Sequence, residues 1–185
     1  MLSSVQRAAL PEYEEDYCTK SPYSPYQDFE RHGQLFERFI TMLAPKSVLD
    51  VGCAYGYIVK RCLDIDIFAV GLDISTWCSR QLVIPGHYII GTAWMLPFKT
   101  KAFDVLFCEG ALEHIPENKI ELLMAEFGRV SNRRMLGITY DTSYTPGHIC
   151  NHDADWWFSR VPVNTLLGKT GRSLDREDEW LIKTL

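Results

Sequence analysis

One feature constrains the fold of this chain more than any other: a short apolar strand followed by a glycine-containing turn. An acid at the end of the next predicted strand belongs to the same feature. Val48–Gly56 reads as an apolar strand and a tight turn, in which small residues at 52, 54 and 56 let the backbone approach a ligand. A helix expected over 57–63 would aim its unpaired N-terminal amides at that turn. Asp73 closes the next apolar run, where a carboxylate can accept both hydroxyls of a ribose. The pattern predicts a cofactor that contains a nucleoside.

The spacing of the turn argues against a dinucleotide cofactor. The dinucleotide fingerprint has glycines at the first, third and sixth positions, and counting from Gly52 this chain offers Gly52, Ala54 and Tyr57. A tyrosine in the last position would obstruct the close packing of helix on strand that the third glycine permits. A nicotinamide-dependent oxidoreductase would use the same acid to bind its ribose, so this function remains an alternative hypothesis, although the spacing of the turn disfavours it.

The run Asp50–Gly56 instead resembles the first motif of the class I S-adenosylmethionine-dependent methyltransferases, with Ala54 where that motif has its middle glycine. Further segments resemble the family in the same order, from about residue 26 to about residue 160. They are the second strand and its acid, the adenine segment, the fourth strand, the turn after it, and a late histidine–tryptophan signature: Val70–Ser75, Gly91–Phe98, Phe103–Glu109, Ala111–Pro116 and His148–Trp157.

This resemblance implies S-adenosylmethionine as the cofactor. Asp73 would hold the ribose, Gly52 to Gly56 would make room for the methionine portion, and Asp50 would orient its ammonium side. Thr92 stands where many relatives carry an acid for the adenine amine, and a threonine accepts only a weaker, neutral hydrogen bond. The expected cofactor-binding residues are Asp50, Gly52, Cys53, Ala54, Gly56, Asp73, Ile74, Thr92, Ala93, Trp94 and Glu109.

Strand patterns that alternate with helix patterns predict the fold. The expected strands are 47–51, 67–72, 87–90, 103–108 and 135–140, and the expected helices are 27–43, about 57–63, 75–82, 117–130 and 153–161. This order implies an α/β, Rossmann-like, doubly wound and mostly parallel sheet with helices on both faces. The family usually ends its sheet with two antiparallel strands. Trp180–Thr184 supplies one of them, and a hairpin at Gly168–Gly171 would allow a second, so we expect a sheet shortened at this end.

Length and composition predict one soluble domain. Residues 26–185 would form the cofactor-binding methyltransferase domain, and residues 1–25, rich in tyrosine, an N-terminal segment or lid. The net charge of −5 gives no reason to expect nucleic acid, and no stretch approaches a membrane span or a signal peptide. Six scattered cysteines without a Cys-x-x-Cys pair favour a reducing cytoplasm. The expected partner is a small-molecule acceptor.

Three side chains are candidates for the chemistry: Glu109, His114 and His148. Glu109 and His114 follow the fourth strand, at the carboxyl edge where open α/β sheets bind ligands. A general base is needed only when the acceptor must lose a proton, and otherwise positioning suffices. His114 is a base, a metal ligand beside Glu113, or a residue that only shapes the pocket.

A metal is a second hypothesis for the late segment, because His148 and His152 lie near Asp153 and Asp155. The alternative is that Asp153 or His152 caps the helix that carries two adjacent tryptophans, of which only one can face the core. No compact metal signature stands on a helix here, so the sequence assigns no metal ligands.

These features predict a methyltransferase that acts at oxygen or nitrogen of a small or medium-sized acceptor. The alternative is a non-catalytic module that binds S-adenosylmethionine and has a regulatory or structural role. The cofactor motifs are expected in an enzyme and in a non-catalytic module alike. Only a complete acceptor pocket would distinguish the two hypotheses.

Overall fold

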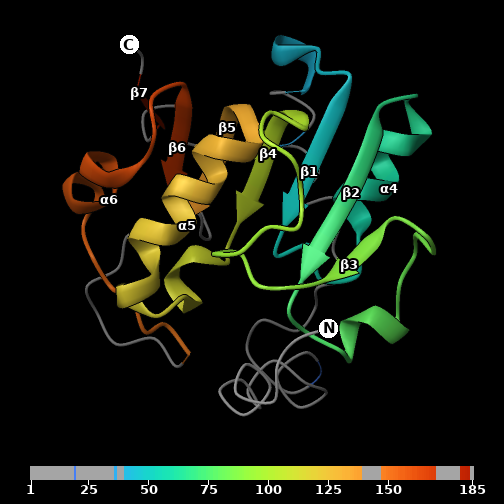
Figure 1. Cartoon of the computed structure of the whole chain (residues 1–185), viewed down its shortest axis with the longest axis horizontal. Coiled ribbons are helices and arrows are strands. Elements are labelled where there is room, and N and C mark those ends of the chain that lie inside the picture. The colour runs from blue at the N-terminus through green and yellow to red at the C-terminus, as the bar shows by residue number, and fades with distance from the viewer. Residues whose placement is uncertain (1–18, 20–35, 37–39, 139–146, 170–179, 184–185) are drawn as a thin grey trace.

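The computed structural model describes residues 19, 36, 40–138, 147–169 and 180–183, and Figure 1 draws the remaining ones as a thin trace. The described part is built on one seven-stranded sheet in the order β3-β2-β1-β4-β5-β6-β7. The strands are β1 (Ser47–Val51), β2 (Phe68–Asp73), β3 (Tyr88–Ile90), β4 (Phe103–Glu109), β5 (Ser131–Ile138), β6 (Thr165–Lys169) and β7 (Trp180–Lys183). Six strands run parallel and β7 pairs antiparallel with β6. The Rossmann-like, mostly parallel fold class predicted from the sequence is confirmed.

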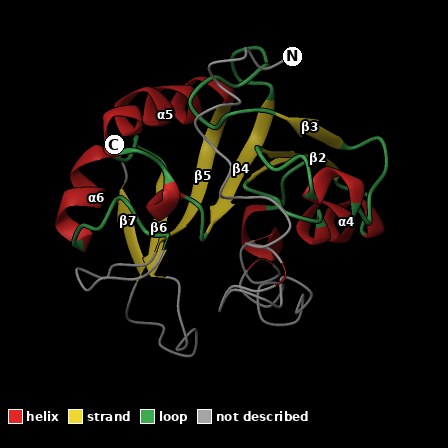
Figure 2. Ribbon diagram, turned by 90° about the horizontal axis from the view of Figure 1, so that it is seen from below, coloured by secondary structure: helices red, strands yellow, loops and turns green. Residues whose placement is uncertain are grey.

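Helices cover both faces of the sheet (Figure 2). On one face lie α5 (Glu117–Val130) and α6 (Ala154–Arg160), and on the other lies α4 (Tyr57–Asp64). Two apolar cores follow from this arrangement: one contains Phe127 of α5 and Trp157 of α6, and the other contains Val59 of α4. None of the described helices combines the length and apolar character needed to cross a bilayer.

The strand order reverses between β1 and β4. The chain runs outward from β1 through β2 to β3, then returns to place β4 on the other side of β1 (Figure 1). At such a switch point the two connections leave the sheet in opposite directions, which opens a crevice at the carboxyl ends of the strands. The crevice lies between the turn after β1 and the turn after β4.

Two of the predicted elements need correction. The helix expected over 75–82 is only the 3₁₀ turn η2 (Cys78–Arg80), because the Ser75 hydroxyl accepts the Cys78 backbone N–H at 3.0 Å and fixes a short turn. The fifth strand begins at Ser131 instead of 135, directly after α5. Of the helix expected over 27–43, only residues 36 and 40–43 lie within the described part, and they are helical.

The C-terminal edge differs from the second antiparallel strand that a hairpin at Gly168–Gly171 would have allowed. β7 matches the strand predicted at Trp180–Thr184, but β6 runs parallel to β5 and includes Gly168, where the hairpin was expected. The predicted N-terminal segment or lid, 1–25, lies outside the described residues except for Thr19. The division into that segment and a domain over 26–185 stays a prediction.

Candidate functional site

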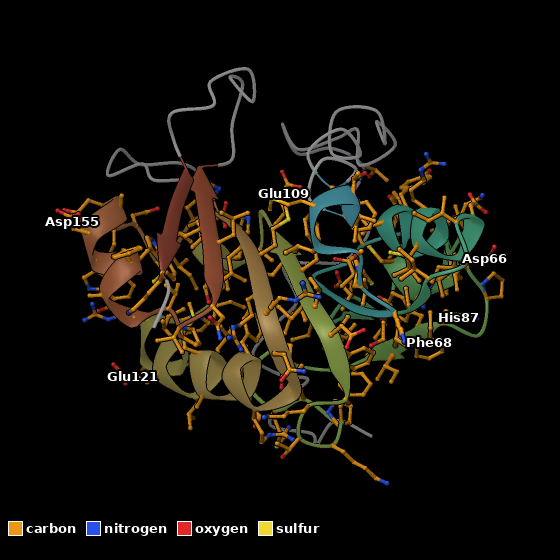
Figure 3. All side chains as sticks on the ribbon, turned by 90° about the horizontal axis from the view of Figure 1, so that it is seen from above. Asp66, Phe68, His87, Glu109, Glu121 and Asp155 are labelled. Carbon is orange, nitrogen blue, oxygen red and sulfur yellow. The ribbon has the colours of Figure 1, made fainter. Side chains whose placement is uncertain are left out.

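A pocket occupies the crevice at the switch point. Its walls come from the turns after β1 and β4, the end of β2 and the segment after β3. Figure 3 labels Glu109 at this end of the sheet, whereas Glu121 and Asp155 stand on the outer surfaces of α5 and α6. The lining residues are Val51, Gly52, Ala54, Leu72, Asp73, Ile74, Ser75, Cys78, Gly91, Ala93, Trp94, Cys108, Glu109, Gly110, Ala111, Leu112, His114, Ile115 and Pro116.

The turn after β1 needs its glycines for two separate reasons. Gly52 and Gly56 have φ of 80° and 85°, in the region that residues with a side chain rarely adopt. Each is also crowded: a Cβ on Gly52 would stand 2.7 Å from Ala111 Cβ, and one on Gly56 would stand 2.4 Å from Ile84. Gly52 therefore sets how closely the turns after β1 and β4 approach across the pocket.

Asp73 joins the turn after β1 to the end of β2. Its Oδ2 accepts the Ala54 backbone N–H and its Oδ1 accepts the Ser75 backbone N–H, both at 2.9 Å. Burial raises the pKa of Asp73, and these backbone N–H bonds offset part of the rise. Each carboxylate oxygen has a further lone pair. The side chain therefore retains the capacity to accept hydroxyl donors from a ligand in the pocket.

Three carboxylates, those of Asp50, Asp73 and Glu109, crowd this end of the sheet. Asp50 is buried on β1, and its pKa is raised well above the ordinary value, first by burial and then by the negative charges of Asp73 and Glu109. Burial, together with nearby carboxylates, also raises the pKa of the Cys108 thiol, which therefore stays protonated. The described lining contains no lysine or arginine. A ligand that carries positive charge would relieve this repulsion, whereas a phosphate would add to it.

The segment 91–98 forms the wall beside β3 and is clamped from α5. Leu96 N donates to Glu126 at 2.7 Å, and Arg129 donates to the carbonyls of Leu96 and Phe98 at 3.1 and 2.6 Å. Glu126 and Arg129 also pair with each other. Arg129 lowers the pKa of Glu126, chiefly through their hydrogen bond. This clamp has no signal in the sequence, because its two residues are typical of the polar face of a helix.

Some of the expected cofactor-binding residues line the pocket, and others do not. Those that line the pocket are Gly52, Ala54, Asp73, Ile74, Ala93, Trp94 and Glu109. Asp50, Cys53, Gly56 and Thr92 lie outside the lining and are buried. Cys53 packs on Gly71, and Thr92 Oγ1 has no hydrogen-bond partner among the described residues. Lining residues outside the expected set include Ser75, Cys78, Gly91, Cys108, Gly110, Leu112 and Ile115, and most of these belong to segments that resemble the family.

His114 and His148, far apart in the sequence, come together beside the pocket. Their rings meet edge to face, with centroids 4.9 Å apart and planes at 87°. The segment that carries His148 is docked on the turn after β4, because the Glu113 carbonyl accepts the N–H groups of Ile149 and Cys150. His114 Nδ1 lies 2.8 Å from the Gly147 carbonyl oxygen, and burial lowers the pKa of the His114 ring. His114 lines the pocket and His148 lies behind it.

The grouping of His148 with His152, Asp153 and Asp155 is not formed. Asp153 Oδ1 accepts the Trp156 backbone N–H at 2.9 Å, so Asp153 caps α6 as the alternative proposed. His152 stacks on Trp156, with ring centroids 3.7 Å apart, and its Nε2 lies 3.1 Å from Glu117. The metal hypothesis for this set was wrong, because Asp153 and His152 serve the start of α6, whereas His148 lies against His114.

Comparison with known proteins relates the central part of the chain to a known family. Residues 49–134 match the family model described as "Methyltransferase domain". A tRNA U34 carboxymethyltransferase from Nautilia profundicola is 34% identical over 84 residues, and an uncharacterized protein from Methanocaldococcus jannaschii is 34% identical over 68 residues. The aligned parts are 40% and 37% of this chain, and they span only 28% and 29% of those two relatives.

Solved structures share the fold. The YcgJ protein from Bacillus subtilis superposes with a TM-score of 0.58 and 18% identity, over 70% of this chain and 66% of that one. A SAM-dependent methyltransferase from Archaeoglobus fulgidus gives 0.50 and 19%, over 56% and 48%. The domain match covers residues 49–134, and these structures, at 18% and 19% identity, show that the chain shares their fold. Over these residues the match confirms the resemblance to S-adenosylmethionine-dependent methyltransferases that the sequence predicted.

Proposed function

We propose that this chain binds S-adenosylmethionine in the pocket at the switch point and transfers its methyl group to oxygen or nitrogen of a small or medium-sized acceptor. The observation that carries the proposal is the group of three carboxylates, Asp50, Asp73 and Glu109, around a pocket whose described lining has no cationic side chain. S-adenosylmethionine brings a sulfonium and an ammonium, which such a site stabilises. A nicotinamide dinucleotide brings a pyrophosphate, which it repels.

Each part of the cofactor has a suitable partner in this arrangement. The ribose hydroxyls would donate to Asp73, whose oxygens already fix the turn that holds Ala54. The methionine portion would lie over Gly52, where the absence of a side chain leaves room. The adenine would lie along Ala93 and Trp94, on the wall held by the clamp from α5. The methyl group would then point toward Glu109 and His114, the proposed acceptor side.

The acceptor side can accelerate the transfer with little covalent chemistry. Methyl transfer from a sulfonium is an in-line displacement, so holding the acceptor atom against the methyl carbon supplies most of the rate. Glu109 and His114 are the proposed catalytic contacts, and His148 supports His114 from behind. Cys108 lies in the same wall but stays a thiol, which makes it unsuitable as a nucleophile.

The name of the Nautilia relative describes transfer of a carboxymethyl group to tRNA. A carboxymethyl group carries a negative charge, which the carboxylates of Asp73 and Glu109 in the pocket lining would repel. The net charge of −5 also gives the chain no general attraction for a phosphate backbone. These charges support plain methyl transfer to a small acceptor. The proposed compartment is the cytoplasm, where buried free cysteines such as Cys53 and Cys108 stay reduced.

A second candidate function, a module that binds the cofactor without turnover, is favoured by the extent of the family match. The match covers residues 49–134, which hold the cofactor walls, and ends before the segment that carries His148. Isothermal calorimetry with S-adenosylhomocysteine, with NAD as the control, tests both candidates. Selective binding of S-adenosylhomocysteine supports the site, and binding of neither ligand contradicts it. Selective binding without release of S-adenosylhomocysteine from the methyl donor, across panels of hydroxyl and amine acceptors, would favour the non-catalytic module.

A further inference from the structure

Glu113, His114 and His148 form a buried cluster of metal-binding side chains on the acceptor side of the pocket. One donor atom from each lies within 4.8 Å of the donor atoms of the other two. Their exposed fractions are only 1%, 7% and 6%. Groups of this polarity are seldom fully buried unless they are hydrogen-bonded, paired with a charge or bound to a metal ion.

The backbone holds the three side chains in place from both sequence segments. Two N–H groups from Ile149 and Cys150 bind the carbonyl of Glu113 at 2.9 and 3.0 Å, so the two segments are fastened at the cluster itself. Asn151 adds a third restraint by donating its amide to the His148 carbonyl at 3.0 Å. The cluster is therefore a built arrangement, in contrast to the partly buried His152 and the exposed Asp153 at the start of α6.

The tautomer of His114 suits a metal ligand. A carbonyl oxygen only accepts, so the 2.8 Å contact with Gly147 requires that Nδ1 of His114 carries the proton. In the neutral ring the lone pair then lies on Nε2. Histidines that bind metals usually donate their other ring N–H to a carbonyl or carboxylate in this way, which fixes the ring orientation. The bond to Gly147 is an observation independent of the cluster distances, and it points to the same use.

We propose that Glu113, His114 and His148 bind one divalent transition-metal ion, with Zn²⁺ or Fe²⁺ preferred over Mg²⁺ or Ca²⁺. Two imidazoles and one carboxylate form the ligand set of open zinc sites and of non-haem iron sites, whereas Mg²⁺ and Ca²⁺ favour oxygen ligands. Ligands of a tetrahedral Zn²⁺ at about 2.1 Å stand roughly 3.4 Å apart. The separations of up to 4.8 Å would thus have to contract by up to about 1.4 Å when the ion binds.

The open position of this ion faces the pocket, because His114 is both a ligand and part of the lining. This role rests on the proposed methyl transfer and deepens it: the acceptor is a hydroxyl compound whose oxygen occupies the open position. The oxygen forms a bond to the methyl carbon while the carbon–sulfur bond breaks and its electron pair stays on sulfur. The hydroxyl proton passes to the Glu109 carboxylate in the same wall and then to solvent. In this arrangement His114 acts as a ligand and not as the base.

The test is metal uptake by the full chain, stripped with a chelator and titrated with Co²⁺ as a spectroscopic stand-in for Zn²⁺. We expect close to one equivalent, with visible absorption bands typical of mixed nitrogen and oxygen ligands, and displacement by Zn²⁺. His148→Gln and Glu113→Gln should each weaken uptake by at least about 100-fold, as loss of a ligand exceeds the 10–100-fold effect of a supporting residue. The matched control is His152→Gln, because His152 is partly buried and close in sequence but outside the cluster.

Two outcomes overturn the proposal: wild-type protein that takes up no stoichiometric Co²⁺, or uptake that His152→Gln weakens as much as His148→Gln does. The first outcome does not depend on any variant, so a misfolded variant cannot obscure it. Calorimetry with S-adenosylhomocysteine on the same samples separates the two proposals. Cofactor binding without metal uptake rejects the metal site alone, and metal uptake without cofactor binding rejects the proposed function alone.

Discussion

The carboxylate of Asp73 accepts a hydrogen bond from the backbone N–H of Ala54 at 2.9 Å, and through this bond the end of β2 holds the turn after β1. The other oxygen accepts from Ser75, so a single side chain fixes both walls of the proposed ribose site. A residue that binds a ligand and also shapes the pocket should affect affinity and stability together.

Asp73→Asn should therefore weaken binding of S-adenosylhomocysteine by about 1–3 kcal/mol, because an amide offers one acceptor oxygen where the carboxylate offers two. The free energy of unfolding should fall too, since one of the two backbone N–H groups loses its partner. Calorimetry and urea denaturation measure the two effects. Asp66→Asn, an exposed position with φ of 61° that asparagine tolerates, is the control. Full affinity in a folded Asp73→Asn variant would remove Asp73 from the ribose site.

Asp50 should make cofactor binding depend on pH. Burial, and then the charges of Asp73 and Glu109, raise its pKa, so its contribution to stability is present below the ordinary pKa of an aspartate and is lost as pH rises through the raised value. A bound cation favours the charged carboxylate and lowers that pKa. Binding of S-adenosylmethionine should then release a proton near the raised pKa, and affinity should rise with pH until it levels above it.

Calorimetry in buffers of different ionisation enthalpy measures this proton release. Asp50→Asn should abolish the release and, above the raised pKa, increase the melting temperature, because a buried charge is removed. S-adenosylhomocysteine lacks the sulfonium charge and should release less than S-adenosylmethionine in the wild type. Equal release by Asp50→Asn and wild-type protein would assign the proton to another group.

The bounds of an element could be predicted from the sequence where its apolar residues recur with a single helical or strand spacing along its whole length. The helix over 117–130 and the strand over 47–51 have the predicted bounds, because their apolar residues face a core along their whole length. The fifth strand was predicted four residues late because Asn132, Arg133 and Arg134 read as a polar loop. The guanidinium of Arg134 is buried on that strand and donates to Thr165 and to carbonyls that include Ser131. A buried charge whose partners are Thr165 and backbone carbonyls leaves no periodic signal in the sequence.

The residues of the site likewise fall into those that the sequence could predict and those that it could not. Gly52, Asp73 and Glu109 were predicted because each stands at the end of a recognisable strand. The clamp of Glu126 and Arg129, and the meeting of Glu113 with His148, depend on how loops fold back over the sheet. Neither spacing nor composition reports such contacts between distant segments.

The Glu126–Arg129 pair should control the cofactor wall from a distance. Arg129→Ala removes two bonds to the carbonyls of Leu96 and Phe98 and should lower the free energy of unfolding by about 1–2 kcal/mol, since both groups are partly exposed. Affinity for S-adenosylhomocysteine should fall as well, although Arg129 is not part of the lining. Lys60→Ala, which breaks the exposed Lys60–Asp64 pair on α4, should change neither quantity by more than a few tenths of a kcal/mol. Normal affinity in Arg129→Ala would show that the wall holds its position without the clamp.

Alanine substitutions at two glycines with similar backbone angles distinguish the cost of backbone strain from the cost of steric crowding. Gly52 and Gly86 have φ of 80° and 91°, but a Cβ on Gly52 meets Ala111 Cβ at 2.7 Å, whereas one on Gly86 meets nothing within 4 Å. Gly86→Ala should cost only the strain, about 1–2 kcal/mol. Gly52→Ala should cost roughly 1–3 kcal/mol more through overpacking, and it should weaken S-adenosylhomocysteine binding because Ala111 lines the pocket.

The double variant Gly52→Ala/Ala111→Gly tests the cause directly. It removes the methyl group that the new side chain would strike, so it should recover most of the loss beyond the Gly86→Ala value, and cofactor affinity should recover with it. Urea denaturation and calorimetry provide both readouts. If the double variant is no more stable than Gly52→Ala, contact between the turns after β1 and β4 does not limit the pocket, and backbone strain at Gly52 accounts for the whole effect.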